Sequence, residues 1–148
     1  MPSLWHPEAH ARLRTRLAAL RPDAGPLWGK MNAPQMLAHV NDALRMATGE
    51  LPVKPRKLPV RFWPIKQLMI YVLPFPKGVP TARELLARID GAQFAQETAA
   101  FPAELEKFAS QPAHARLPAH PAFGPLTRRA WGVLAYRHVD HHFRQFGV

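Results

Sequence analysis

Histidine is the residue type in this sequence that is best suited to chemistry, since eight histidines occur among 148 residues. His138 and His142 lie four residues apart in a segment with helical periodicity, so their imidazoles share one helix face and can bind the same metal ion. Leu134 and Ala135 lie on or beside that face, which indicates that it points toward the interior. The segment therefore predicts an inward-facing pair of metal ligands.

A tight site needs a third ligand, and His39 is the best placed residue for that role. It lies three residues after Met36 and four before Ala43, in or at the edge of the apolar stripe of another predicted helix. Three imidazoles that leave one position open suit zinc or nickel, with room for water or a substrate. The residues predict a divalent metal ion, zinc or nickel, held by His39, His138 and His142.

Other interpretations of these histidines stay open. His141 lies on the same helical turn and could replace His142 as a ligand. Pairs with this spacing also arise by chance, as at His6 and His10, which we expect near an exposed helix start. A histidine placed like His39 is also common in a protein core, where it is simply hydrogen-bonded.

The carboxylates nearest to these histidines in the sequence are Asp42 and Asp140. Either could accept a hydrogen bond from a ligating imidazole or act as a general base. Sequence spacing does not place them, so the catalytic residues are left unassigned.

The composition excludes several classes of protein. With no cysteine, the chain has no disulfide scaffold, thiolate zinc site or cysteine nucleophile. The formal net charge is +10, and residues 51–83 contain seven basic residues and no acidic ones, which suits a nucleic acid, an anionic membrane surface or an acidic ligand. We see no signal peptide and no apolar run long enough to span a bilayer, and so expect a cytoplasmic protein without a membrane partner.

Helical periodicity dominates the sequence, and no segment favours a strand. Asn32 and Gln35 predict a capping box, and Gly49 a helix end. We expect helices over 6–20, 32–49, 65–73, 81–89 (from a Thr81 and Glu84 capping box), 93–110 (bent near Pro102) and 127–146 (capped by Thr127). The predicted fold is all-α, a four-helix bundle forming a single domain over residues 1–148. A long proline-rich crossover over 51–80 would allow two neighbouring helices to run parallel.

Longer motifs extend these observations. They are Trp28 with Asn32-Ala-Pro-Gln-Met-Leu-Ala-His39, Leu73-Pro-Phe-Pro-Lys-Gly-Val-Pro-Thr81, His120-Pro-Ala-Phe-Gly-Pro-Leu-Thr127, and Tyr136-Arg-His-Val-Asp-His-His-Phe-Arg-Gln-Phe-Gly147. The chain thereby resembles the DinB/YfiT-like superfamily of metalloenzymes, and most closely a branch that ends in His-His-x-x-Gln-Phe-Gly. The resemblance covers most of the chain.

The resemblance implies a four-helix bundle that is usually a homodimer. It also implies a divalent metal held by one histidine of the second helix and a His-x-x-x-His pair of the last, at the positions of His39, His138 and His142. His141 falls between the family ligands and is left out of the metal's first shell. Relatives include thiol-dependent S-transferases and hydrolase-like enzymes.

These observations give three hypotheses for function. The first is a metal-binding protein, a metal-dependent hydrolase or thiol S-transferase acting on an unknown small molecule. The second is a non-catalytic binding or structural homodimer with a vestigial metal site. The third is a basic nucleic-acid-binding protein that uses Lys54, Arg56, Lys57 and Arg61 beside Phe62 and Trp63. We rank nucleic acid as an unlikely partner because no recognition-helix signature accompanies the charge.

A homodimer is also expected from the apolar residues of the crossover. Trp63, Met69, Ile70, Tyr71 and Phe75 lie within residues 58–76 and outside the predicted helix stripes. That segment must fold over the helices or meet another copy, since an apolar patch of this size is rarely left in solvent. The basic residues Lys54, Arg56 and Lys57 are expected at the rim of such an interface or away from it.

Overall fold

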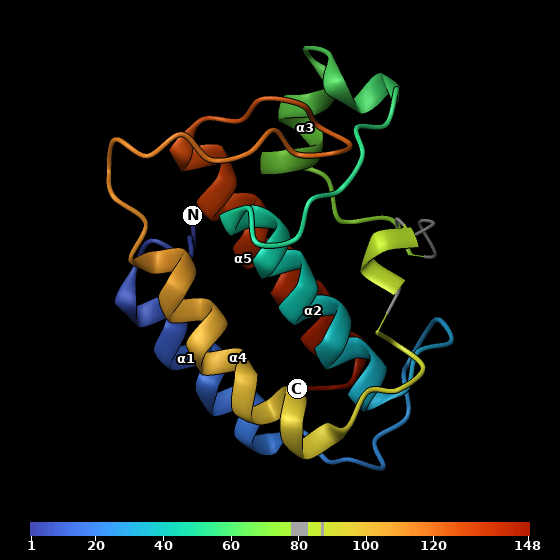
Figure 1. Cartoon of the computed structure of the whole chain (residues 1–148). Helices are drawn as coiled ribbons and strands as arrows, with labels where there is room; N and C mark the ends of the chain where they lie inside the picture. Colours follow the sequence, from blue (N-terminus) through green and yellow to red (C-terminus); the bar gives the residue numbers. More distant parts are fainter. Residues whose placement is uncertain (78–82, 87) are drawn as a thin grey trace.

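The computed structural model describes residues 1–77, 83–86 and 88–148. In these ranges the chain is helical or irregular, apart from one isolated bridge between His120 and Gly124. The all-α prediction is confirmed. Figure 1 shows the described elements, which are the α-helices α1 (Pro7–Ala19), α2 (Ala33–Thr48), α3 (Ile65–Tyr71), α4 (Phe94–Ala109) and α5 (Arg128–Gln145), with the 3-10 helices η1 (Pro59–Arg61) and η2 (Arg83–Leu86).

The ends of α2 follow directly from the local sequence. The Asn32 side chain accepts a hydrogen bond from the backbone N–H of Gln35, and the Gln35 side chain accepts one from the backbone N–H of Asn32, both at 2.9 Å. Gly49 ends the helix with a φ of 89°, a left-handed conformation that glycine adopts without strain. The predicted capping box is confirmed, and it fixes where α2 begins relative to His39.

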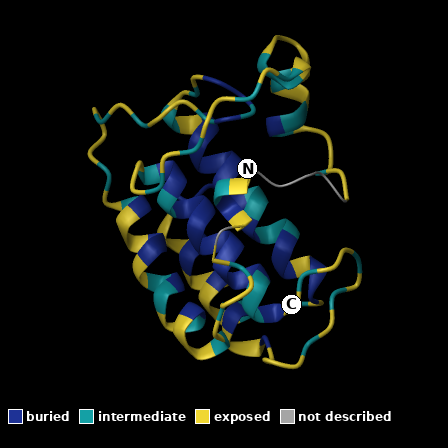
Figure 2. Ribbon diagram, turned by 45° about the vertical axis from the view of Figure 1, so that its right-hand side comes forward, coloured by how far each residue is buried: buried dark blue, intermediate teal, exposed yellow. Residues whose placement is uncertain are grey.

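Four helices surround the main core. α2 packs against α4 and α5, and α1 packs against the same two helices. Figure 1 shows α2 and α4 running in the same direction, as the long crossover between them allows. Figure 2 shows that buried residues line the facing sides of these helices, and the rings of Phe101, Phe108 and Phe143 are fully buried there. The candidate metal ligands thus lie on α2 and α5, two helices that pack against each other.

Part of the crossover is held against α5. Ile70 of α3 is almost fully buried. Arg137 of α5 donates hydrogen bonds to the backbone carbonyls of Met69 (2.9 Å), Ile70 (2.5 Å) and Leu73. These carbonyls lie at the C-terminal end of α3, where a helix has no partners of its own for them. Arg137 therefore fixes α3 beside the helix that carries His138 and His142.

The rest of the crossover leaves apolar surface in solvent. Phe62 is 68% exposed, Trp63 is 80% exposed and Val72 is 67% exposed. Of the apolar residues that were expected to fold over the helices or to meet another copy, Ile70 packs on α5 with Met69, Tyr71 and Phe75 against it, whereas Trp63 stays on the surface. The three exposed side chains lie just before or just after α3, beyond its contact with α5.

Two local expectations need correction. Of the helix expected over 81–89, the described residues show the four-residue η2, which includes Leu85 and Leu86, and Ile89 lies in a turn; Thr81 lies outside the described residues. His10 is buried, not exposed, because its ring nitrogen Nε2 is 2.7 Å from the carbonyl oxygen of Leu4. Leu4 is itself held by a hydrogen bond from its N–H to the Gly132 carbonyl of α5, so α5 covers the start of α1.

No described helix combines the length and the hydropathy that are needed to cross a membrane.

Candidate metal centre

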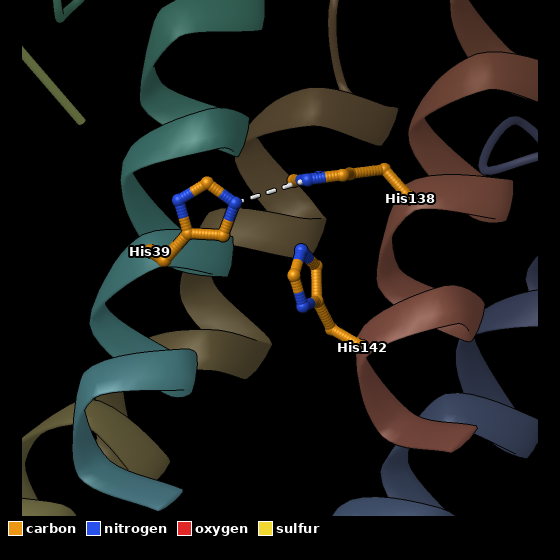
Figure 3. Close-up of side chains that lie close together, drawn as sticks. All are labelled: His39, His138 and His142. Atoms are coloured by element: carbon orange, nitrogen blue, oxygen red, sulfur yellow. Dashed lines mark hydrogen bonds between the residues drawn. The ribbon is translucent and has the colours of Figure 1, made fainter. Parts of the chain in front are cut away.

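The three predicted ligands converge between α2 and α5. One ring nitrogen from each of His39, His138 and His142 lies within 4.8 Å of the other two. Figure 3 shows His39 on α2 facing the two histidines of α5, which lie on successive turns. The Nε2 atoms of His39 and His138 are 3.1 Å apart. The predicted pair His138 and His142 on α5 therefore lies close to His39 across the interface between α2 and α5.

Gln145 fixes the orientation of the His142 ring. Its Oε1 lies 2.8 Å from Nδ1 of His142, and since an amide oxygen only accepts, Nδ1 carries the hydrogen. This leaves Nε2 with a lone pair. Gln145 in turn donates from Nε2 to the Trp28 carbonyl (2.5 Å), and it packs so closely on Gly29 that a Cβ there would come within 2.6 Å of it. The segment preceding α2 thus holds the side chain that orients a ligand on α5.

Burial keeps the three imidazoles neutral. Desolvation lowers the pKa of His39 to about 4, although the nearby Leu85 backbone and the charge of Asp42 oppose the shift. Desolvation, with a smaller contribution from His39, lowers the pKa of His142 to about 3. The pKa of His138 is lowered well below its ordinary value by burial and by the neighbouring histidines. At neutral pH each ring therefore has an unprotonated nitrogen, the form that binds metals.

The arrangement fits a zinc-like ion. Ligand nitrogens about 2.0–2.1 Å from a tetrahedral ion lie about 3.3 Å apart, close to the 3.1 Å between His39 and His138. Nδ1 of His39 is buried beside the Leu85 backbone and makes no well-formed hydrogen bond within the described residues. Three neutral nitrogen donors suit zinc or nickel better than magnesium or calcium, which prefer oxygen.

The histidines lie in the wall of a cavity of about 660 Å³, a volume typical of small-molecule sites. The lining comes mainly from α2 and α5, with residues 28–31 and 120–123, Met69 of α3 and further residues of the crossover. Most of it is apolar, including Met69, Phe75 and Leu134, while Lys30 and Arg56 bring positive charge. No carboxylate of the described residues lines this space. The cavity therefore offers neutral metal ligands in an apolar, weakly cationic setting.

No protein-family model, curated protein or solved structure matches the chain. The resemblance to the DinB/YfiT-like superfamily therefore stays a prediction from sequence motifs.

The alternative ligand and the candidate carboxylates lie outside the cluster. His141 points its ring toward Trp28 and Phe75, with centroids 5.5 and 5.9 Å away. Asp42 is engaged by Arg45 and Arg88, and Asp140 by Arg16 and Arg144. Neither carboxylate hydrogen-bonds one of the three histidines among the described residues, because nearby guanidinium groups take up their oxygens. The roles of imidazole acceptor and general base that the sequence suggested for them are therefore not seen.

Two site residues were missed by reasoning from the sequence. Gln145 enters the sequence analysis only as part of the last motif, although its position three residues after His142 places the two on one face. His120 was noted only as part of a motif, yet it lies in the cavity wall, and burial lowers its pKa to about 4. The sequence gave no signal for this placement, because the loop over 111–127 has no periodicity from which the position of His120 could be inferred.

Proposed function

We propose that the chain is a divalent-metal-binding protein of the DinB/YfiT-like superfamily with a four-helix-bundle fold, and that it acts on a small molecule as a metal-dependent hydrolase or thiol S-transferase. The supporting observation is the convergence of His39, His138 and His142 in the wall of a cavity of substrate size. Catalytic zinc sites combine three protein ligands with an open position, whereas structural sites are closed by four. A three-histidine set that borders an open cavity favours the catalytic kind.

The residues around the cluster support this role. Burial holds the three imidazoles neutral, and Gln145 keeps the hydrogen of His142 on Nδ1, away from the cluster. A bound ion supplies Lewis-acid chemistry and lowers the pKa of a water or thiol. The mostly apolar wall, which includes Met69 and Phe75, lowers the local dielectric and thereby strengthens any electrostatic interaction inside.

The test is the metal content of protein purified without a histidine tag. We expect about one zinc or nickel per chain by elemental analysis, and the loss of nearly all of it in His39→Ala, His138→Ala and His142→Ala. His6→Ala is the matched control, because His6 is exposed and lies outside the cluster. An unchanged metal content in His142→Ala would contradict the proposal.

A non-catalytic homodimer with a vestigial metal site is the second candidate, and two observations favour it. The described lining of the cavity lacks a carboxylate that could act as a general base. The exposed side chains of Phe62, Trp63 and Val72 form apolar surface of the kind that a second copy would cover. We propose the homodimer through this surface for either candidate.

Light scattering at low micromolar concentration tests the dimer. We expect twice the chain mass of 16.7 kDa for the parent protein and a shift toward the single-chain mass in Trp63→Ser. Leu27→Ser is the control, because Leu27 is 70% exposed but lies in the segment before α2. A parent protein with the mass of one chain would contradict the dimer.

A screen for zinc-dependent ester hydrolysis and thiol transfer then distinguishes the two candidates. Activity favours the enzyme, and no activity favours the vestigial metal site.

A further inference from the structure

His120 places a hydrogen-bond donor in the cavity wall. Its Nδ1 accepts hydrogen bonds from the backbone N–H groups of Ala122 (3.1 Å) and Phe123 (3.2 Å). A ring nitrogen that accepts two such bonds carries no hydrogen, so these contacts assign the hydrogen to Nε2. Within the described part of the chain, no acceptor hydrogen-bonds this Nε2. The ring is therefore a neutral donor whose tautomer is set by its own loop.

The loop that carries His120 is rigid. His120 and Gly124 exchange two backbone hydrogen bonds, of 2.9 and 2.7 Å, which close a tight turn. Arg61 donates to the Pro121 carbonyl and packs over Gly124, where a Cβ would meet its guanidinium at 3.2 Å. The His120 ring itself lies beside Phe123 and Trp131, with centroids 5.0 and 5.3 Å away. A donor held this firmly is preorganised for a ligand.

The electrostatics of the cavity select the charge of that ligand. Lys30 and Arg56 line the space, and Lys77 lies over the ring of Trp28, which also lines it, with Nζ 4.3 Å from the centroid. The described lining contains no acidic side chain that would attract a cation. The remaining wall is mostly apolar and gives a ligand's body little opportunity to form hydrogen bonds. These features fit an apolar molecule with one anionic group.

We propose that the cavity binds an amphiphile with an apolar body and a single carboxylate head, and that His120 donates a hydrogen bond from Nε2 to that head. The inference deepens the proposed function by naming the ligand class of the same cavity. It rests on that function for the metal, but the hydrogen bond from His120 does not require the metal. His120 and the candidate metal ligands His39, His138 and His142 line the same cavity.

Calorimetric titration of the full chain with sodium octanoate tests the proposal, on zinc-loaded and on chelator-treated samples whose zinc content is measured. Octanoate should bind at least tenfold more tightly than octylamine or 1-octanol, which share its chain but not its charge. Hexanoate should bind about fifteenfold more weakly than octanoate, because it lacks two methylenes and each buried methylene changes affinity about fourfold. Equal binding of octanoate and octylamine would overturn the proposal.

The variant His120→Asn isolates the donor. Its side-chain oxygen can accept from the same two backbone N–H groups, so the turn is preserved, while the Nε2 donor is lost. We expect at least tenfold weaker octanoate binding and octanol binding within twofold of the parent, since a hydrogen bond to a charged group is worth a factor of ten or more. His114→Asn, at an exposed histidine, is the matched control and should change neither. Equal losses for octanoate and octanol would show a structural role and overturn the assignment.

The measured zinc content separates this inference from the proposed function. Zinc-loaded protein that fails to bind octanoate would overturn the inference and leave the metal site standing. Protein that binds no zinc but binds octanoate with the His120 dependence described would support the inference and contradict the proposed function.

Discussion

The two sides of α2 differ sharply in their chemistry. Toward α4, at what we call the paired seam, the helix presents Asn41 and Asp42, which interact with Arg88 and the buried Glu97. Asp42 Oδ1 is 2.8 Å from Arg88 Nη2, and Glu97 Oε1 is 3.0 Å from Arg88 Nη1. Toward α5, at the cavity side, it presents His39, whose contacts are neutral rings and open space.

The difference shows how one helix divides structural and functional roles. On the paired seam the buried carboxylates of Asp42, Glu97 and Glu104 are each paired with a guanidinium group. On the cavity side the buried polar groups are neutral imidazoles, and one ring nitrogen of each lies within 4.8 Å of the other two. We therefore expect changes on the paired seam to alter folding stability, and changes on the cavity side to alter binding.

The largest expected effect is the response of the metal-free protein to pH. The folded pKa of His39 is about 4 and that of His142 about 3, against an ordinary value of about 6.5, so below pH 6.5 the unfolded chain binds more protons. Their contribution to stability is complete above pH 6.5 and is lost as pH falls from 6.5 toward 4. Each histidine lowers the free energy of unfolding by about 1.4 kcal/mol per pH unit in that window.

Urea denaturation at pH 7, 6 and 5 in the presence of a chelator measures this slope. His142→Leu should reduce it by about 1.4 kcal/mol per pH unit relative to the parent chain. The carboxylates titrate alike in both proteins, so the difference isolates the histidine. Identical pH slopes in His142→Leu and the parent chain would contradict the conclusion that His142 is buried and neutral.

The second effect belongs to the paired seam. Arg45→Met should lower the free energy of unfolding by about 3 kcal/mol, because Asp42 and Glu104 lose a guanidinium partner while buried. Zinc affinity should stay within threefold of the parent. Arg21→Met, which removes only an exposed ion pair with Asp23, should change stability by less than about 1 kcal/mol. A large loss of zinc affinity in Arg45→Met would contradict the assignment of stability to the paired seam and of binding to the cavity side.

The third effect is on metal affinity alone. Gln145→Met should weaken zinc binding by about 10- to 100-fold, because the His142 ring loses the acceptor that fixes its orientation. Competition with a zinc chelator of known affinity measures the change. Gln67→Met, on the exposed surface of α3, should leave zinc affinity unaltered.

The smallest effect is expected where α2 borders the open cavity. Ala43→Met projects a longer apolar side chain into that space, so it should change the free energy of unfolding by less than about 1 kcal/mol. Octanoate binding should weaken as the volume is reduced. Asn41→Met on the paired seam, which deprives the Glu97 side chain and carbonyl of a donor, should cost about 2 kcal/mol. Similar costs at both positions would contradict the comparison.

The sequence was sufficient wherever the determining contacts are local. The capping box at Asn32 and Gln35 lies within four residues, and the pair His138 and His142 needs only helical geometry. His39 could be proposed because its position relative to an apolar stripe indicates the face on which it lies.

Contacts between distant segments could not be predicted in this way. Asp42 lies on the same helix as His39, yet its partner Arg88 comes from the segment where a helix was expected and the structure has a turn. The exposure of Trp63 depends on where the crossover leaves α5, which proline density alone does not specify. For His120, the sequence shows a turn motif but not the helix beside which the turn packs.

Arg137 links the filling of the cavity to the geometry of the metal ligands. It is the residue immediately before His138, and its guanidinium holds the last carbonyls of α3, the helix that contributes Met69 to the cavity wall. An outward displacement of α3 must first break these hydrogen bonds, which raises the kinetic barrier to opening that wall. We therefore expect that replacing Arg137 would change both how long a molecule stays in the cavity and how His138 is oriented.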